Sequence, residues 1–509
     1  MASLSLHMWL PLLLLLFPFI FLLKKKLNSK HLPPGPPGLP IIGNLHQLGT
    51  LPPYSLWQLS KKYGPVMLLQ LGQIPTVIIS SAEAAKELIK TNDLNSCSRP
   101  CSAATGRLSY NFLDISFAPY GDYWREMRKI CVLELFSAKR VQSFQSIREE
   151  EVGFLIDSIL KSSLKSSSPV DLSEKTLSLT ANVICRAAFG KSFQERGFNH
   201  DRFQEAIHEA FAMLGSFPAT DFFPHVGWIV DRLTGLHTTL ERVFQEFDEF
   251  YQKIIDDHIQ MGKADPGHED IIDVLLDLER HRTASGGIQI SRNHIKAILM
   301  DIFLAGVDTG AVVMVWAMTE LVRNPRVMRK AQEEIRSLIG EKIKVSESDT
   351  DKFIYLKSVL KETMRLHPPV PLLLPREAIS QFNINDYEIH PKTRIQVNVW
   401  AIGKDPKIWK NPEEFIPERF IDNSIDFRGQ NYEFLPFGGG RRSCPGITMG
   451  LALVELALAN LLFCFDWELP YNMKEADINM EEKFGLTNHK KEALMLVPIK
   501  YHHLLYNKE

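Results

Sequence analysis

The segment from Phe437 to Gly446 constrains this chain most, because it combines three consecutive glycines, two arginines and one cysteine. A long apolar run over residues 447–465 follows it and is typical of a buried helix. The glycines permit positive φ angles and a close approach of the backbone to a ligand. The start of this helix and the nearby Arg442 both favour a thiolate at Cys444. The alternative interpretation is a small core cysteine beside a helix.

Five residues of this segment follow the spacing F-x-x-G-x-R-x-C-x-G, namely Phe437, Gly440, Arg442, Cys444 and Gly446. This pattern resembles the haem-binding loop of the cytochrome P450 family. The resemblance implies haem b as the cofactor, with Cys444 as the thiolate ligand of its iron. It also implies that Arg442 faces a haem propionate, that Phe437 shields the sulfur, and that the glycines Gly440 and Gly446 let the backbone lie close to the porphyrin.

Composition excludes several other classes of protein. The 509 residues carry a net charge of −2, so nucleic acid is not an expected partner. The six cysteines are scattered, which predicts neither a disulfide framework nor a zinc site. A reducing, cytosol-facing environment is therefore favoured.

The N-terminus predicts a membrane anchor. Met8 to Leu23 is almost wholly apolar, and four lysines follow it by residue 30 with none before it. By the positive-inside rule the rest of the chain stays in the cytosol. The alternative, a cleaved signal peptide, would need a basic region before the apolar core and a small-residue cleavage site after it. We therefore expect an anchor at 1–30, a proline-rich hinge at 31–40 and a catalytic domain at 41–509, with single-pass insertion in the endoplasmic reticulum membrane by resemblance to microsomal members.

Periodicity predicts a mainly helical fold with small β-sheets. Residues 65–80 indicate a β-hairpin, and Ser81 caps a short helix that runs to Lys90. Ser291 to Asn324 indicates one very long helix. Late strands are expected at 383–389, 394–399 and 493–498. With the resemblance, the expected architecture is the cytochrome P450 fold.

The middle of the long helix carries unusual polar residues. Asp308 and Thr309 follow Ala305-Gly306-Val307 in an otherwise apolar stretch, where a carboxylate is costly to bury and a threonine hydroxyl can bend the helix. One interpretation is a polar kink with a solvated face. The other is the family's A-G-x-D/E-T-T/S pattern, in which Asp308 and Thr309 relay protons as catalytic residues. Gly310 departs from the sixth position, and we expect this departure to affect helix shape and pocket volume.

Two further groups of charged residues fit the family. Glu362 and Arg365 share a helical face, and by resemblance Arg419 of Pro417-Glu418-Arg419-Phe420 completes a structural cluster with them. The alternative is a surface salt bridge that contributes little to stability. Trp124 and Arg128 lie one helical turn apart and suit a carboxylate. By resemblance they donate to a haem propionate, with Arg376 as a further candidate.

The substrate pocket is assigned by resemblance alone. Its expected lining includes Phe112, Ala305, Val370, Leu372 and Phe484, which implies a small lipophilic substrate such as a terpenoid, an alkaloid or a phenolic. The blander account of these apolar side chains is core packing. The resemblance to plant microsomal members of the secondary-metabolism type implies a monooxygenase that uses O2 and NADPH. Its electrons would come through NADPH–cytochrome P450 reductase, with cytochrome b5 as a second donor. A haem-thiolate isomerase and a non-catalytic haem sensor are the alternatives, and retention of Asp308-Thr309 argues against both.

Overall fold

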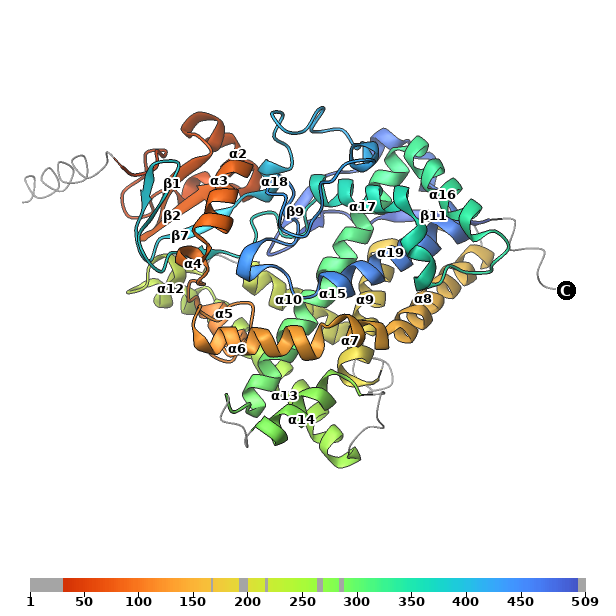
Figure 1. The fold of residues 1–509 in the computed structure, drawn as a ribbon, viewed down its shortest axis with the longest axis horizontal. Helices are drawn as coiled ribbons and strands as arrows, with labels where there is room; N and C mark the ends of the chain where they lie inside the picture. Colours follow the sequence, from red (N-terminus) through yellow and green to blue (C-terminus); the bar gives the residue numbers. More distant parts are fainter. Residues whose placement is uncertain are drawn as a thin grey trace, which may run out of the picture.

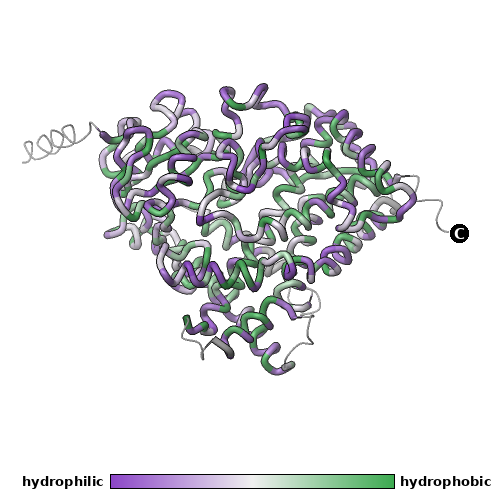
Figure 2. Tube along the Cα trace, in the orientation of Figure 1, coloured by the Kyte–Doolittle hydropathy of each residue, from purple (hydrophilic) through white to green (hydrophobic). Residues whose placement is uncertain are grey.

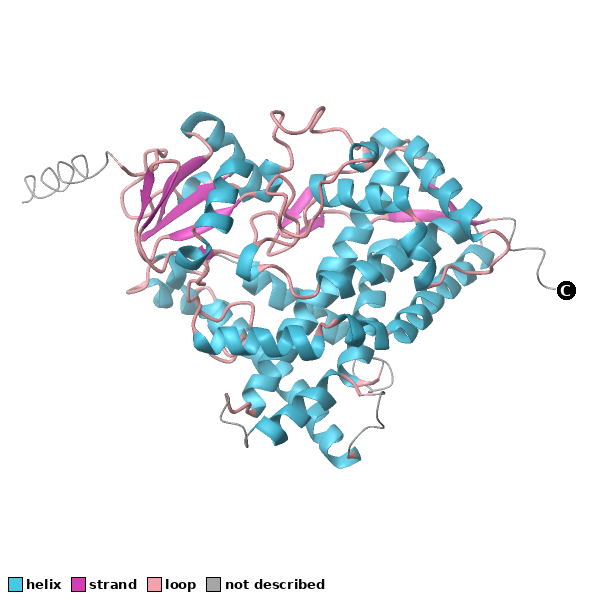
Figure 3. Ribbon diagram, viewed as in Figure 1, coloured by secondary structure: helices cyan, strands magenta, loops and turns pink. Residues whose placement is uncertain are grey.

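The protein is described here by a computed structural model, which covers residues 31–165, 168–191, 200–215, 218–262, 269–282 and 288–501. Figure 1 shows a sheet-rich side, which holds β1, β2 and β7, beside a larger body of helices. Figure 3 shows the same division by secondary structure, with most of the strands gathered on one side. Hydrophilic and hydrophobic segments alternate along the helices in Figure 2, as expected when each helix buries one face.

The largest sheet begins with the predicted hairpin. β1 (Val66–Leu71) and β2 (Ile74–Ile79) pair antiparallel, with Val66 opposite Ile79. β7 (Arg394–Val397) joins β2 in parallel, and β4 (Arg376–Glu377) completes the order β1-β2-β7-β4. β7 is shorter than the predicted 394–399, because the Asn398 side chain accepts a hydrogen bond from Ala401 and caps a new helix, α18 (Val399–Ile402).

The proline-rich segment lies against this sheet rather than standing free of it. The Leu68 amide donates to the Pro34 carbonyl at 2.9 Å, and a Cβ on Gly35 would lie 1.9 Å from the Leu68 carbonyl oxygen. Pro33 and Pro36 are buried. The segment expected to be a hinge is therefore docked on β1 from about residue 33 onward, while the predicted anchor at 1–30 lies outside the described residues.

The helical body is built around α15 (Arg292–Arg323), which confirms the predicted long helix with Ser291 as its N-cap. α15 packs on α9 (Leu172–Phe189), α19 (Ile447–Cys464) and α17 (Ile354–Leu366). Among the described helices, α15 and α19 are long and apolar enough to cross a membrane, but 72% and 67% of their most apolar windows are buried inside the protein. They are core helices of this fold.

Two glycines of α15 face α9 and not a pocket. A Cβ on Gly306 would lie 2.6 Å from Ile184 Cδ1, and one on Gly310 would lie 3.3 Å from Thr180 Cγ2. The expectation that Gly310 affects pocket volume is therefore wrong, because this residue sets the approach of α9 to α15 instead.

The remaining elements complete the body and three small sheets. A hairpin of β5 and β6 replaces the single strand predicted at 383–389, because Asn385 and Asp386 have positive φ angles and form a turn. β3, β11 and β8 form one sheet and β9 pairs with β10. The other helices and strands are α2 (Pro52–Tyr63), α3 (Ala82–Lys86), α4 (Asp93–Ser96), α5 (Ala103–Leu108), α6 (Asp122–Ile130), α7 (Ala138–Ser143), α8 (Gln145–Lys165), α10 (His200–Gly215), α11 (Ala219–Phe222), α12 (Gly227–Leu233), α13 (Leu236–Met261), α14 (Ile271–Arg282), α16 (Pro325–Ile339), β3 (Val170–Asp171), β5 (Phe382–Ile384), β6 (Tyr387–Ile389), β8 (Phe465–Glu468), β9 (Glu482–Phe484), β10 (Asn488–Lys490) and β11 (Met495–Lys500).

Candidate active site

The loop before α19 is a tight turn that presents the sulfur of Cys444. The Cys444 amide donates to the Phe437 carbonyl at 3.0 Å, which closes the loop. Gly438 and Gly440 have φ angles of +68° and +67°, in the region where a side chain is strained. A Cβ on Gly440 would also lie 2.7 Å from the Asp93 carboxylate. The glycines are therefore required by backbone geometry and by a close neighbour.

Asp93 of α4 fastens this loop, and the sequence alone did not point to it. Its carboxylate, in a residue only 4% exposed, accepts from the Arg376 guanidinium at 2.8 Å. It also accepts from the backbone amide and the guanidinium of Arg441, at 3.0 and 2.9 Å. Arg376 in turn donates to the Gly439 carbonyl at 2.9 Å. Arg376 thus lies at the loop, as its prediction as a haem-binding residue requires.

The cation beside the sulfur is Arg128 and not Arg442. Burial raises the pKa of the Cys444 thiol, while the backbone amide of Gly446 and the charge of Arg128 lower it. Arg128 donates to the Ser443 carbonyl. The expectation that Arg442 favours the thiolate is wrong, because its guanidinium is turned away and donates to the carbonyls of Cys97 at 2.7 Å and Ala118 at 2.6 Å.

Trp124 is also engaged within the protein. Its indole nitrogen donates to the Ile115 carbonyl at 2.9 Å, and its ring lies 4.1 Å from the Arg442 guanidinium. Arg128, Arg376 and Arg442 line the cavity at the sulfur, whereas Trp124 is not part of that lining. All three arginines therefore lie at the cavity, although the Arg442 guanidinium already donates to three backbone carbonyls. Direct roles for Arg442 and Trp124 toward a carboxylate stay predictions.

A cavity of about 260 Å³ lies between the cysteine loop and α15. Phe437, Cys444 and the backbone of Gly438 and Gly439 form one wall, and Ala305 and Thr309 of α15 lie on its lining as well. The Cys444 side chain is solvent-accessible only because it opens on this space within a buried surround. The lining offers a sulfur ligand, four arginine side chains (Arg99, Arg128, Arg376 and Arg442) and apolar side chains. An iron porphyrin with two carboxylates requires such a set, so these residues fit haem.

The predicted substrate residues divide into three groups. Ala305 and Val370 line the cavity. Leu372 does not, because it is buried against the β1–β2 region and its neighbour Leu373, with a φ of +51°, lines the cavity instead. The side chain of Phe484 lies outside the described part of the structure. Phe211, Leu214 and Leu486 are further apolar residues of the lining.

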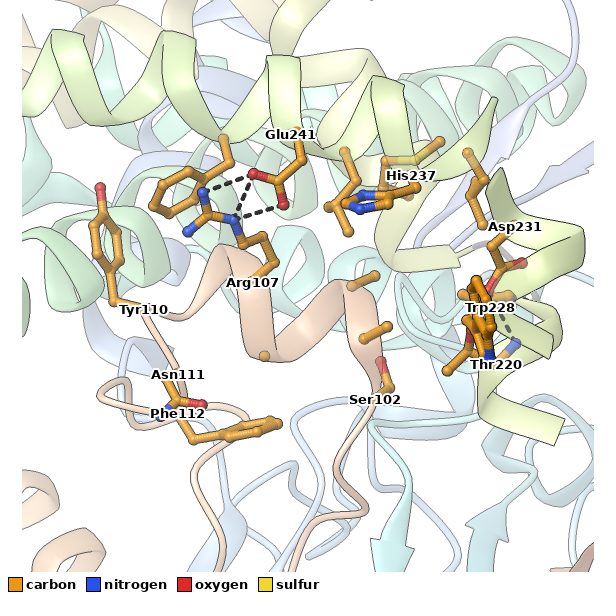
Figure 4. Close-up of a pocket in the computed structure, with 18 of the residues that line it drawn as sticks. Ser102, Arg107, Tyr110, Asn111, Phe112, Thr220, Trp228, Asp231, His237 and Glu241 are labelled. Carbon is orange, nitrogen blue, oxygen red and sulfur yellow. Dashed lines mark hydrogen bonds and ion pairs between the residues drawn. The ribbon is translucent and has the colours of Figure 1, made fainter. Parts of the chain in front are cut away.

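Phe112 lies on a different cavity, shown in Figure 4. Tyr110, Asn111 and Phe112 all have positive φ angles, and a Cβ on Gly106 would touch the Phe112 ring at 2.9 Å. This second cavity, of about 830 Å³, lies across α5 from the cysteine cavity and is bordered by an Arg107–Glu241 ion pair. The assignment of Phe112 to the cysteine cavity is therefore not supported by its position.

The two predicted catalytic residues of α15 have different surroundings. Thr309 faces the cavity, and its hydroxyl donates to the Ala305 carbonyl at 2.8 Å within the helix. Asp308 is only 2% exposed, and its carboxylate accepts hydrogen bonds from the Thr487 hydroxyl and, at 3.1 Å, from the His489 ring. No pattern in the sequence pointed to these two partners.

A pair of acids on the cavity wall was also missed. Asp301 of α15 accepts from the backbone amides of Ile115 and Ser116 at 2.8 and 3.2 Å, and Asp114 accepts from the Phe117 amide at 2.9 Å. Burial, and then the negative charge of Asp301, raise the pKa of Asp114 well above its ordinary value. Burial raises the pKa of Asp301 to about 6. The two buried acids therefore both favour the protonated form more than a carboxyl in water does. Asp301 is a second acid, beside Asp308, in the apolar helix α15, and this feature of the sequence could have identified the pair.

The structure brings Glu362, Arg365 and Arg419 together as the sequence predicted. Glu362 and Arg365 are fully buried, and they form two hydrogen bonds of 2.7 and 2.8 Å. Arg419 donates to Glu362 at 2.9 Å. Arg365 also donates to the carbonyls of Gly403 and Pro412, so the cluster ties α17 to the segment that leads toward the cysteine loop.

Comparisons with known proteins agree with this geometry. The family model for cytochrome P450 matches residues 33–497. Cytochrome P450 71B34 of Arabidopsis thaliana is 56% identical over 482 residues, which are 95% of this chain and 96% of the relative. Cytochrome P450 71B10 of the same plant is 54% identical over 498 residues, which are 97% and 99% of the two chains.

A zebra fish cytochrome P450 solved with abiraterone has the same fold, with a TM-score of 0.75 and 26% identity over 89% of this chain and 100% of that chain. The predicted family and fold class are thus confirmed. This chain belongs to the cytochrome P450 family, among plant relatives, and is a haem-thiolate monooxygenase with haem b as its cofactor.

Proposed function

We propose that this enzyme hydroxylates or otherwise oxidises a lipophilic plant specialised metabolite, such as a terpenoid, an alkaloid or a phenolic, in the cavity at Cys444. The observation that carries the proposal is the lining of this cavity. Ala305, Val370 and Leu373 contribute apolar surface near the sulfur, which favours a substrate bound chiefly by burial of apolar area.

Different residues of the chain have different proposed roles in haem binding, proton supply and structural support. Cys444 would ligate the haem iron, and the cavity-lining Arg128, Arg376 and Arg442 would hold the propionates. When bound, haem supplies the iron at which O2 is activated. Thr309 lies at the cavity wall, where its hydroxyl passes protons into the cavity. Asp308, one residue earlier on α15, supplies these protons to Thr309. Glu362, Arg365 and Arg419 keep the cysteine side rigid.

Electrons come from a redox partner, as in the family as a whole, and we propose NADPH–cytochrome P450 reductase, with cytochrome b5 as a second donor. Support comes from exposed cations on α6 and α7, namely Arg125, Lys129 and Lys139. They offer a basic face to an acidic flavoprotein. Two cations of these helices are less available, because Arg125 forms an ion pair with the exposed Asp122 and Arg140 forms one with Glu269.

We also propose that the protein lies on the endoplasmic reticulum membrane with its catalytic domain in the cytosol. The apolar segment before residue 24 supports an anchor. Exposed apolar side chains add a second point of contact: Ile41 is 82% exposed, and on α12 Trp228 and Leu233 are 51% and 83% exposed. Both regions adjoin the β1–β2 turn, because Gly72 donates to the Ile42 carbonyl and Gln73 to that of Phe222.

The first experiment records the spectrum of the reduced protein with carbon monoxide. We expect the signal of a thiolate-ligated haem in the wild type and its loss in Cys444→Ala, because the sulfur is the iron ligand. Cys101→Ala is the matched control, since Cys101 is an exposed free cysteine outside the cavity lining. An unchanged spectrum in Cys444→Ala would overturn the assignment.

The second experiment addresses the substrate class. Lipophilic plant metabolites are incubated with microsomes that contain this protein and the reductase, with and without NADPH. Product that forms only with NADPH supports the proposal and separates a monooxygenase from an isomerase, which would need neither NADPH nor O2. Conversion that is equally fast without NADPH would overturn it.

A further inference from the structure

Asp308 is reached by two side chains of the C-terminal β-hairpin region. Thr487 donates to Asp308 Oδ2, and His489 Nε2 lies 3.1 Å from the same oxygen. His489 Nε2 is also 3.0 Å from Thr487 Oγ1. The three polar atoms are therefore mutually within hydrogen-bond distance, although Asp308 and His489 are 181 residues apart in the chain.

This triangle extends from the surface to the cavity. The side chain of His489 is 35% exposed, whereas that of Asp308 is 3% exposed. Thr487 is buried and lines the cysteine cavity, as does Thr309. Asp308 thus has almost no contact with solvent of its own, and the partly exposed imidazole of His489 is an ionisable side chain in direct contact with its carboxylate.

The surroundings of His489 are suited to a histidine that exchanges protons. His489 is on β10, and Lys483 of β9 is its cross-strand partner. Asp308 from α15 contacts the ring, and Lys483 occupies the paired position on β9. Histidine is the side chain that most readily gains and loses a proton near neutral pH.

We propose that His489 and Thr487 are relay residues that resupply protons to Asp308. The inference rests on the proposed role of Asp308 and Thr309 in proton delivery. The imidazolium gives its Nε2 proton to the Asp308 carboxylate, and the carboxylic acid passes a proton through hydroxyl and water to the cavity. His489 then takes one proton from solvent. Each cycle moves one proton from solvent to the cavity and leaves all three side chains as they began.

The competing account is that Thr487 and His489 only hold Asp308 in place. Both accounts predict that Asp308→Asn is harmful, so the deciding variants are His489→Gln and Thr487→Val. Glutamine keeps a hydrogen-bond donor near Asp308 but cannot carry a proton. Valine keeps the shape of threonine and removes the hydroxyl. His390→Gln is the matched control, because His390 lies in an exposed turn.

The first measurement needs no known substrate. Holoenzyme with reductase consumes one NADPH for each O2 released as hydrogen peroxide, and two NADPH for each O2 reduced to water. Water formation needs protons in the cavity, so we expect His489→Gln and Thr487→Val to release a several-fold larger fraction of O2 as peroxide. The reduced carbon monoxide spectrum should stay that of the wild type in both variants, which shows that haem is held.

The second measurement reports on the contact itself. In ¹⁵N-histidine-labelled, reduced and carbon-monoxide-bound holoenzyme, the signal missing from His489→Gln belongs to His489. We expect it to move in Asp308→Asn and in Thr487→Val, because Nε2 loses a partner, and to stay in place in Thr309→Ala.

The outcomes separate the two proposals. If Asp308→Asn and Thr309→Ala raise peroxide release while His489→Gln and Thr487→Val do not, the relay through His489 is wrong and the role of Asp308 and Thr309 stands. If none of the four raises it, both are wrong. A His489 signal that does not respond to Asp308→Asn would overturn the contact on which the inference rests.

Discussion

The carboxylates on the two sides of the catalytic cavity have different partners. On the cysteine side, Asp93 and Glu362 are each held by two arginines, at 2.7–2.9 Å. On the side of α15, burial raises the pKa of both Asp114 and Asp301, and Asp308 meets a hydroxyl and an imidazole. Among the described residues, no arginine or lysine forms an ion pair with these three acids.

This difference separates two uses of buried charge. An acid paired with arginine stays ionised and fixes geometry, because guanidinium does not give up its proton. An acid paired with another acid, a hydroxyl or an imidazole can gain and lose a proton. The cysteine side is therefore suited to hold a fixed geometry, and the α15 side carries acids that can exchange a proton, as the proposed role of Asp308 requires. Three substitutions test this distinction.

The largest effect is expected from Glu362→Ala. The change leaves the fully buried Arg365 and the nearly buried Arg419 without their common carboxylate. Loss of one partner of a buried ion pair destabilises by about 3–5 kcal/mol. Chemical unfolding of the holoprotein, followed by circular dichroism, measures this loss; where the variant yields no folded protein, Glu362→Gln provides the milder version.

Glu241→Ala is the control for this change. Its partner is Arg107, and both side chains are about one third exposed. An ion pair of this kind contributes about 0–1 kcal/mol. Equal losses of folding stability in Glu241→Ala and Glu362→Ala would show that the buried cluster on the cysteine side stabilises the protein no more than a surface ion pair does.

A smaller effect is expected from Asp93→Asn. The amide keeps one acceptor oxygen but loses the charge that Arg376 and Arg441 share, so a stability loss of about 1–3 kcal/mol is expected. Because Asp93 holds the loop that carries Cys444, haem should also dissociate faster, which is measured by transfer to a haem-scavenging protein. In Asp122→Asn, where the ion pair with Arg125 is on the surface, neither quantity should change. Unchanged haem release in Asp93→Asn would contradict the proposed fastening of the loop.

The sequence predicted local features of this site well and long-range partners poorly. The spacing around Cys444, the i,i+3 pair of Glu362 and Arg365, and the long helix α15 each depend on neighbouring residues, and the structure contains all of them. Asp93 meets Arg441 across 348 positions, and Thr487 meets Asp308 across 179. Only the tertiary fold brings such pairs together, so no local pattern marks them.

Side-chain direction was the other source of error. Arg442 is next to the sulfur in sequence but its guanidinium points to the carbonyls of residues 97 and 118, and Arg128 of α6 takes its place. Leu372 and Leu373 are neighbours, but only Leu373 lines the cavity, because a positive φ angle reverses the chain there. Composition and spacing do not determine which of two adjacent residues faces a cavity.

The smallest effect on folding stability is expected from Asp114→Asn, which should stabilise the protein where the other two substitutions destabilise it. The folded protein raises the pKa of both Asp114 and Asp301, so it holds protons that the unfolded chain has already released. The stability from this pair is therefore fully present below the ordinary carboxyl pKa, of about 4, and is lost as pH rises.

Asparagine at position 114 can donate an N–H to Asp301 at every pH and can still accept from the Phe117 amide. The variant should therefore lose less stability than the wild type as pH rises above the ordinary carboxyl range, by at most about 1.4 kcal/mol per pH unit. Unfolding by urea across this pH range measures the difference, and Asp301→Asn provides the reciprocal test. A constant difference between Asp114→Asn and the wild type would mean that folding does not raise the pKa of Asp114, and the contrast between the two sides of the cavity would then apply to Asp308 alone.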